Sequence, residues 1–141
     1  MINMTSMRRF TSLIFALVTI LASSCGRIDL NGDWKIISVG VDTVQSSRAV
    51  PTLSFNEETG LVHGYTGVNV FNGEYTQEGR RLSLDNIGMT RMAGPSEDME
   101  LERKIITAFE EVHSTRLTEN EELVFINNEG DTLMVLARKT R

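Results

Sequence analysis

Short segments in which hydrophobic and polar residues alternate, separated by turns that contain glycine, recur through most of this 141-residue sequence. Alternation with a period of two places apolar side chains on one face of a β-strand, so this pattern limits the fold more than any other feature. Val70, Leu82 and Leu84 are expected to face one side, and the polar residues 42–50 read as a loop. Regular short strands of this kind indicate a sandwich or barrel. The predicted strands cover residues 34–39, 52–55, 61–65, 68–71, 73–76, 80–84, 113–117, 122–127 and 131–137.

One helix is predicted after Pro95, with Ser96 as its N-cap. The carboxylates of Glu97 and Asp98 suit the positive end of the helix dipole. Apolar residues then recur at helical spacing and form a single stripe, at Leu101, Ile105, Ala108, Phe109 and Val112. The residues expected to contribute to the core are Trp34, Phe55, Tyr75, Leu82, Leu101, Ile105, Phe109, Leu123, Phe125 and Leu133.

Residues 1–24 have the order of a signal peptide. Arg8 and Arg9 precede the uncharged run 10–22, whose 13 residues are fewer than a bilayer-spanning helix needs, roughly 20. Small residues follow, and then Cys25, the single cysteine of the chain.

Residues 21–25, Leu-Ala-Ser-Ser-Cys, resemble a bacterial lipobox, in which the cysteine becomes an acylated N-terminus. The alternative is an ordinary cleaved signal peptide with a chance cysteine. By resemblance to sorting rules, Gly26 rather than Asp after the cysteine favours the outer membrane. The predicted organisation is a lipoprotein signal peptide over 1–24, a lipidated N-terminus and tether over 25–29, and a folded domain over 30–138.

The charge balance limits the partners of the chain. Its net charge is −5, and without residues 1–24 it keeps 12 basic against 19 acidic residues, a net charge of −7. An acidic surface argues against binding the phosphate backbone of nucleic acids, which needs clustered Lys and Arg. A hydrophobic content of 40% argues against disorder, and a single cysteine excludes a disulfide-stapled domain.

An ordered set of short motifs covers about residues 30–137. The set is Leu30-x-Gly32-x-Trp34, Leu53-x-Phe55, Gly64-x-x-Gly67-x-Asn69, Gly73-x-Tyr75, Thr90-Arg91-Met92-Ala93 and Met99-x-x-Glu102. Through it the chain resembles the META domain family, the HslJ-like small proteins of bacterial envelopes. The resemblance implies a mainly β fold, α+β by strict count: a small open antiparallel β-barrel of lipocalin-like topology, with about eight strands and one packed helix. It implies no established enzymatic activity and no cofactor.

Two departures from the family pattern concern cysteine. Many members have cysteine at the positions of Val68 and Gly94, and both are absent here. The resemblance implies that such a pair would contact and bridge in an oxidising compartment. Their joint absence supports a structural role for the pair, and an activity that needs those thiols does not transfer to this chain.

Asn69, Thr90 and Arg91 are the candidate binding residues. The glycine cluster at 64–69 offers backbone N–H groups to an anion, or else provides tight strand geometry in which Asn69 bonds nearby backbone. Arg91 is able to clamp a carboxylate of a ligand, to pair with Glu102, or to lie in solvent.

No catalytic residue and no metal site is predicted. His63 and His113 lack the spacing of a helical zinc motif, and adjacent carboxylates point apart on a strand or helix. Thioethers can hold Cu(I), but no Cys or His completes a set with the nearby methionines. Trp34 is expected in the core rather than as a ligand platform. The residues weighed and set aside are Met89, Met92, Met99, Glu57, Glu58, Glu110, Glu111, Glu121 and Glu122.

The sequence therefore favours a non-enzymatic, monomeric lipoprotein, anchored through Cys25 on the periplasmic face of the outer membrane. A META-like domain would bind an envelope protein in envelope maintenance or stress tolerance. One alternative is an inhibitor that presents the loop 85–96, with Arg91, to an envelope hydrolase. Another is a small-ligand carrier with a roomy apolar cavity.

Overall fold

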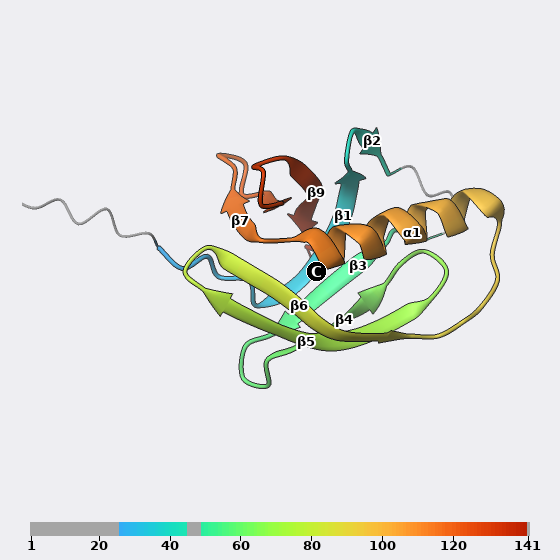
Figure 1. The fold of residues 1–141 in the computed structure, drawn as a ribbon, viewed down its shortest axis with the longest axis horizontal. Coiled ribbons are helices and arrows are strands. Elements are labelled where there is room, and N and C mark those ends of the chain that lie inside the picture. The colour runs from blue at the N-terminus through green and yellow to red at the C-terminus, as the bar shows by residue number, and fades with distance from the viewer. Residues whose placement is uncertain (1–25, 45–48, 141) are drawn as a thin grey trace, which may run out of the picture.

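Nine β-strands and one helix make up residues 26–44 and 49–140, the part of the chain that the computed structural model describes (Figure 1). The predicted signal peptide and Cys25 lie outside the described residues. The elements are β1 (Gly32–Val39), β2 (Asp42–Thr43), β3 (Thr52–Asn56), β4 (Leu61–Tyr65), β5 (Val70–Glu78), β6 (Arg81–Met89), α1 (Ser96–Glu111), β7 (Ser114–Leu117), β8 (Leu123–Ile126) and β9 (Thr132–Arg138).

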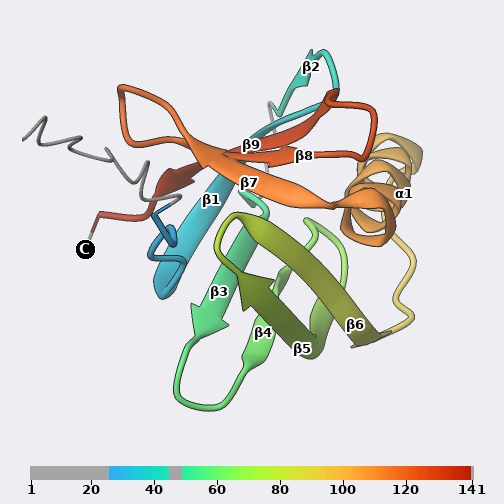
Figure 2. The ribbon, with the colours of Figure 1, turned by 60° about the vertical axis from the view of Figure 1, so that its left-hand side comes forward.

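The strands form one antiparallel sheet that closes on itself. Its order is β2-β1-β3-β4-β5-β6-β7-β8-β9, and β1 also pairs with β9, so eight of the described strands make a ring to which β2 is added. Strand pairing is shortest between β6 and β7, where Arg81 and Ser114 are the one pair in register. Beyond this pair the two strands separate, and α1 lies across the opening (Figure 2). The predicted small β-rich fold with one packed helix is confirmed.

Large apolar side chains fill the interior of the ring. Trp34, Phe71, Phe109 and Phe125 are each at most 2% exposed. The rings of Phe71 and Phe109 pack with their centroids 5.0 Å apart and so join the helix to the sheet. All ten predicted core residues contribute, seven of them buried and three partly buried against the cluster, namely Tyr75, Leu101 and Leu133.

The core begins earlier in the chain than the pattern indicated. Residues 25–29 read as a tether, but Ile28 is only 7% exposed and Leu30 only 2%. The side-chain amide of Gln77 donates to the carbonyl of Ile28 at 2.7 Å, which fixes this segment against β5. The packed domain thus includes the residues from Ile28 onward.

The prediction of two short strands around Asn72-Gly73 is wrong, because β5 runs without interruption from Val70 to Glu78. The Asn-Gly pair marks a shift of register against β6 instead of a turn. A Cβ at Gly73 would lie 2.5 Å from Cδ1 of Ile87, so glycine permits the close approach of β6. Val70 also differs from expectation: it is 57% exposed, and its neighbour Phe71 points inward. The loop predicted over 42–50 contains the short strand β2.

The helix starts at the predicted position with a different cap. Pro95 occupies the N-cap with an extended backbone, and no side chain caps the first turn. Ser96 is already helical, so its hydroxyl lies one residue too late to act as predicted. The apolar stripe is confirmed, with Ile105, Ala108 and Phe109 buried. Within residues 26–44 and 49–140, no helix has the length and apolar character needed to cross a bilayer.

Candidate functional site

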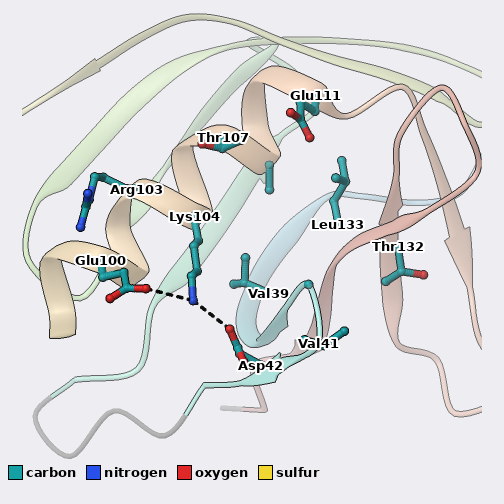
Figure 3. Close-up of a pocket in the computed structure, with 12 residues that line it drawn as sticks. Val39, Val41, Asp42, Glu100, Arg103, Lys104, Thr107, Glu111, Thr132 and Leu133 are labelled. Carbon is teal, nitrogen blue, oxygen red and sulfur yellow. Dashed lines mark hydrogen bonds and ion pairs between the residues drawn. The ribbon is translucent and has the colours of Figure 1, made fainter.

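A groove of about 530 Å³ lies between α1 and the turn that joins β1 to β2 (Figure 3). Val39 and Leu133 face the groove from β1 and β9, and Val41 lies at the tip of the turn. Val39 is 5% exposed, whereas Val41 is fully exposed. The groove thus has an apolar wall on its sheet side, and no described residue covers the side chain of Val41.

Charged side chains line the rim of the groove. Nζ of Lys104 lies 2.8 Å from Oδ2 of Asp42 and 3.4 Å from Oε1 of Glu100, so α1 is tied to β2. The hydrogen bond to Asp42 and then that to Glu100 raise the pKa of Lys104 above its ordinary value. Arg103 and Glu111 also line the groove and form no ion pair with any described residue. An apolar wall with a charged rim suits a segment of another protein, because both kinds of contact are available there.

The groove was not found from the sequence. Its lining comes from α1, the β1–β2 turn and the start of β9, which are far apart in the chain. One cue was available: Val41 follows a glycine in a turn, where an apolar side chain has no strand neighbour to pack against.

Asn69 and Thr90, two of the predicted binding residues, meet in a hydrogen-bond network that is buried at Asn69 and exposed at Thr90. Oδ1 of Asn69 accepts from Oγ1 of Thr90 at 2.9 Å and from the backbone N–H of Met92 at 2.7 Å. Nδ2 of Asn69 donates to the carbonyl of Met92 at 3.2 Å. Asn69 is only 2% exposed, so its side chain fixes the backbone at 90–92 and does not itself face solvent.

Glu102 of α1 completes this network, and sequence reasoning missed that role. It is 6% exposed, and both of its carboxylate oxygens accept from Nδ2 of Asn69 at 3.0 Å. Oε2 also accepts from the hydroxyl of Thr66 at 2.5 Å. No salt bridge to Glu102 is found in the described part of the chain, so hydrogen bonds alone compensate its burial.

The backbone amides of the glycine cluster are used internally. The N–H groups of Val68 and Asn69 both donate to Oγ1 of Thr66, at 3.2 and 2.9 Å, and that of Thr66 donates to the carbonyl of Asn69. An anion would have to displace these bonds. Tight strand geometry is the better interpretation, since a Cβ at Gly64 would overlap the carbonyl oxygen of Thr52.

Arg91 is exposed and forms no ion pair within residues 26–44 and 49–140. The internal pairing with Glu102 that the sequence allowed does not occur, because Asn69 and Thr66 occupy that carboxylate. Of the three predicted binding residues, Thr90 and Arg91 are exposed and Asn69 is buried. The hydroxyl of Thr90 is engaged by Asn69 and by the N–H of Val70.

Val68 and Gly94, the positions of the cysteine pair that the family resemblance implied, are neighbours. An ideal Cβ on Gly94 would lie 3.7 Å from Cβ of Val68 and 3.1 Å from its methyl groups. Cβ atoms joined by a disulfide are about 3.8 Å apart. The contact expected from the resemblance is therefore present in this chain, with valine filling the space.

Strand pairing places Asp33, Ser54 and His63 in one row across β1, β3 and β4. Their order does not suit nucleophilic catalysis, in which the histidine must lie between serine and acid. Here serine is in the middle, and its hydroxyl donates to Asp33 at 2.5 Å, away from His63. The other histidine, His113, lies between α1 and β7, far along the chain from this row.

The surroundings of Trp34 and of the methionines fit a structural role. Nε1 of Trp34 donates to the carbonyl of Leu30 at 2.8 Å, and the guanidinium of Arg138 lies 4.3 Å from the ring centroid. Met89 packs on the core whereas Met92 is 64% exposed, so these methionines do not share one site. The described residues contain no cluster of three or more His, Cys, Asp or Glu side chains able to hold a metal.

Three solved structures are similar in fold. An NMR structure of a protein from Burkholderia xenovorans is 24% identical, with 79% of this chain and 85% of that chain covered and a TM-score of 0.65. A second NMR structure is 26% identical, with 75% and 88% covered and a TM-score of 0.59. A crystal structure of a DUF4847 family protein from Bacteroides vulgatus is 14% identical, with 81% and 96% covered and a TM-score of 0.56.

No curated protein matches the sequence. The names of the three similar structures state no activity. The META domain family model matches residues 28–140, which is nearly the whole described chain and includes the buried Ile28. The chain therefore belongs to the META domain family.

Proposed function

We propose that this protein is a non-enzymatic binding module of the bacterial envelope, anchored in the outer membrane through acylated Cys25 and facing the periplasm. The order of charged, apolar and small residues before Cys25 supports the anchor. In this setting the META domain binds another envelope protein and contributes to envelope maintenance or stress tolerance. Anchoring brings both partners to one surface, so a modest affinity suffices.

The groove beside α1 carries this proposal. A fully exposed valine next to a concave apolar wall offers apolar surface to a partner, and removing that surface from water favours binding. The interior of the ring is filled by aromatic and aliphatic side chains, which leaves the carrier hypothesis without a cavity inside the described ring. The row of Asp33, Ser54 and His63 lacks catalytic order, which favours binding over hydrolysis.

The test places a photo-crosslinking amino acid at Val41 in the full chain, expressed in its own cells. The matched control carries the same group at Val70, an exposed valine on β5 outside the groove. We expect a discrete adduct from position 41 and none from position 70. Equal labelling at both positions, or none at 41, would refute the groove as a binding surface.

Mass spectrometry of the N-terminus tests the anchor separately. We expect a diacylglyceryl-modified Cys25 in membrane fractions, and release of the Cys25→Ala variant from them. An unmodified Cys25 would refute the lipoprotein assignment and leave the groove experiment unaffected.

A second candidate function, inhibition of an envelope hydrolase, is favoured by one observation. The segment 90–92 is exposed at Arg91 and Met92, yet its backbone is held by the buried side chain of Asn69. Rigid exposed loops are what inhibitors present to enzymes. Purified protein should then reduce the hydrolytic activity of envelope extracts, and an Arg91→Glu variant should not.

A further inference from the structure

We infer that Arg91 and Met92 form a preorganised recognition tip, held by Asn69 and Glu102, for a protein pocket in which a carboxylate lies beside an apolar wall. This inference rests on the proposed binding role but uses a surface other than the groove. It extends the second candidate function by naming what holds the tip and what the tip would contact.

Arg91 and Met92 belong to the loop between β6 and α1, and this loop extends to one end of the long axis of the molecule (Figure 1). The first described residues, from Gly26, lie at the opposite end. A chain anchored before Gly26 would thus direct the tip away from its own membrane, toward a protein partner and not toward lipid headgroups.

The hydrogen bonds of Glu102 set the orientation of the Asn69 amide. Both carboxyl oxygens of Glu102 accept from Nδ2 of Asn69 at 3.0 Å, so the NH₂ group of Asn69 faces the helix. That orientation turns Oδ1 of Asn69 toward Thr90 and the N–H of Met92. The buried carboxyl group of Glu102 therefore determines, through Asn69, how the exposed loop is held.

The exposed side chains of the tip offer two kinds of contact. Arg91 presents a planar fork of N–H donors that matches a carboxylate, and it has no ionic partner among the described residues. Met92, 64% exposed, presents an adaptable thioether that suits an apolar wall. Because the backbone at Met92 is already held by Asn69, little backbone conformational entropy is lost on binding.

One experiment measures how strongly Asn69 protects the backbone N–H of Met92. Backbone hydrogen exchange at Met92 is compared by NMR between the wild type, Glu102→Gln and a matched control, Glu110→Gln, at an exposed position of the same helix. Glutamine places an NH₂ group against that of Asn69, so we expect exchange at Met92 to rise at least about tenfold, as for loss of one hydrogen bond. Glu110→Gln should leave it unchanged.

If Glu102→Gln does not fold, Thr90→Val replaces it, because this variant removes the hydroxyl that donates to Asn69 and accepts from the N–H of Val70. It should also raise exchange at Met92. The inference that Glu102 and Asn69 fix the loop would be overturned by either of two results. One is an unprotected N–H of Met92 in the wild type, and the other is exchange at Met92 that does not change in the variant that folds.

A second experiment tests recognition. A photo-crosslinking group at the exposed Ala93 should give a discrete adduct in the cells of origin. Arg91→Glu should abolish the adduct and Arg91→Lys should weaken it, whereas Arg116→Glu, at an exposed position on β7, should retain it.

An adduct insensitive to Arg91→Glu, or no adduct at 93, overturns the recognition tip. An adduct at 41 without one at 93 leaves the groove as the binding surface. An adduct at 93 without one at 41 refutes the groove and supports the tip.

Discussion

A methyl group added at Gly64 would overlap the carbonyl oxygen of Thr52 and approach Cζ of Phe71 to 2.8 Å. Since backbone on the neighbouring strand cannot give way without breaking the β3–β4 pairing, Gly64→Ala should cost about 3 kcal/mol of unfolding free energy. Gly88→Ala is the matched control, because its Cβ would meet only Oδ1 of Asn72 at 3.6 Å. Urea unfolding of both variants should separate them, and equal midpoints would contradict the packing argument.

The contact between Val68 and Gly94 makes a second prediction for single residues. The double variant Val68→Cys, Gly94→Cys should form a disulfide in air, because the two Cβ atoms would lie 3.7 Å apart. A bridge closing this loop should stabilise the fold by about 2–4 kcal/mol, measured as the difference in thermal unfolding with and without reductant. The single variant Gly94→Cys is the control. Two free thiols after oxidation would count against the predicted geometry.

Sequence reasoning located Asn69 but not the burial of Glu102. A glutamate beside an apolar stripe is normally assigned to solvent, since burial of a carboxylate is costly unless partners are present. Those partners, Thr66 and Asn69, lie 36 and 33 residues away. Only the folded chain brings them together, so no local pattern could show them.

Among the elements, the strands were predicted where alternation was regular, and were misjudged where an irregularity resembled a turn. Asn72-Gly73 is a strong turn signal, yet β5 continues through it because Gly73 accommodates β6 at a shift of register. The stripe of α1 was predictable from its spacing alone. The groove was not, because it depends on how α1 lies against the β1–β2 turn.

The tie between α1 and β2 gives a pH prediction. The raised pKa of Lys104 means that the folded state favours the ammonium, so the contribution of this tie is complete below the ordinary value of 10.5 and is lost as pH rises through the folded value. Lys104→Gln should therefore lower the urea midpoint slightly at pH 7, with a gap that closes above pH 10.5. The effect is small because Lys104 is exposed to solvent. A gap that is unchanged at strongly alkaline pH would contradict this account.

At the scale of the whole molecule, closure of the ring depends on the last strand. Removing residues 132–141 would leave the edges of β1 and β8 without β9 and would expose Trp34. We expect this truncated chain to lack a cooperative thermal transition by circular dichroism, whereas removal of residues 140–141 alone should preserve it. A cooperative transition in the longer truncation would show that closure is dispensable.

The mainly β fold was predictable because local alternation, turns and helix spacing all agreed. The closing pair was not, because β1 and β9 stand at opposite ends of the sequence and nothing in either strand specifies the other. The position of the β6–α1 loop relative to the start of the described chain likewise follows only from the assembled ring.

The pairing of β1 with β9 also determines the order in which the strands can pair during synthesis. A chain is made from its N-terminus, so β1 can pair with β3 early, but its pairing with β9 requires residues 132–138 to have been made. Contacts of such long sequence separation form slowly, and an open edge beside an unfinished core invites aggregation in the interval. A product that terminates before β9 therefore cannot close the ring. Its exposed strand edges and core would be accessible to chaperones and proteases.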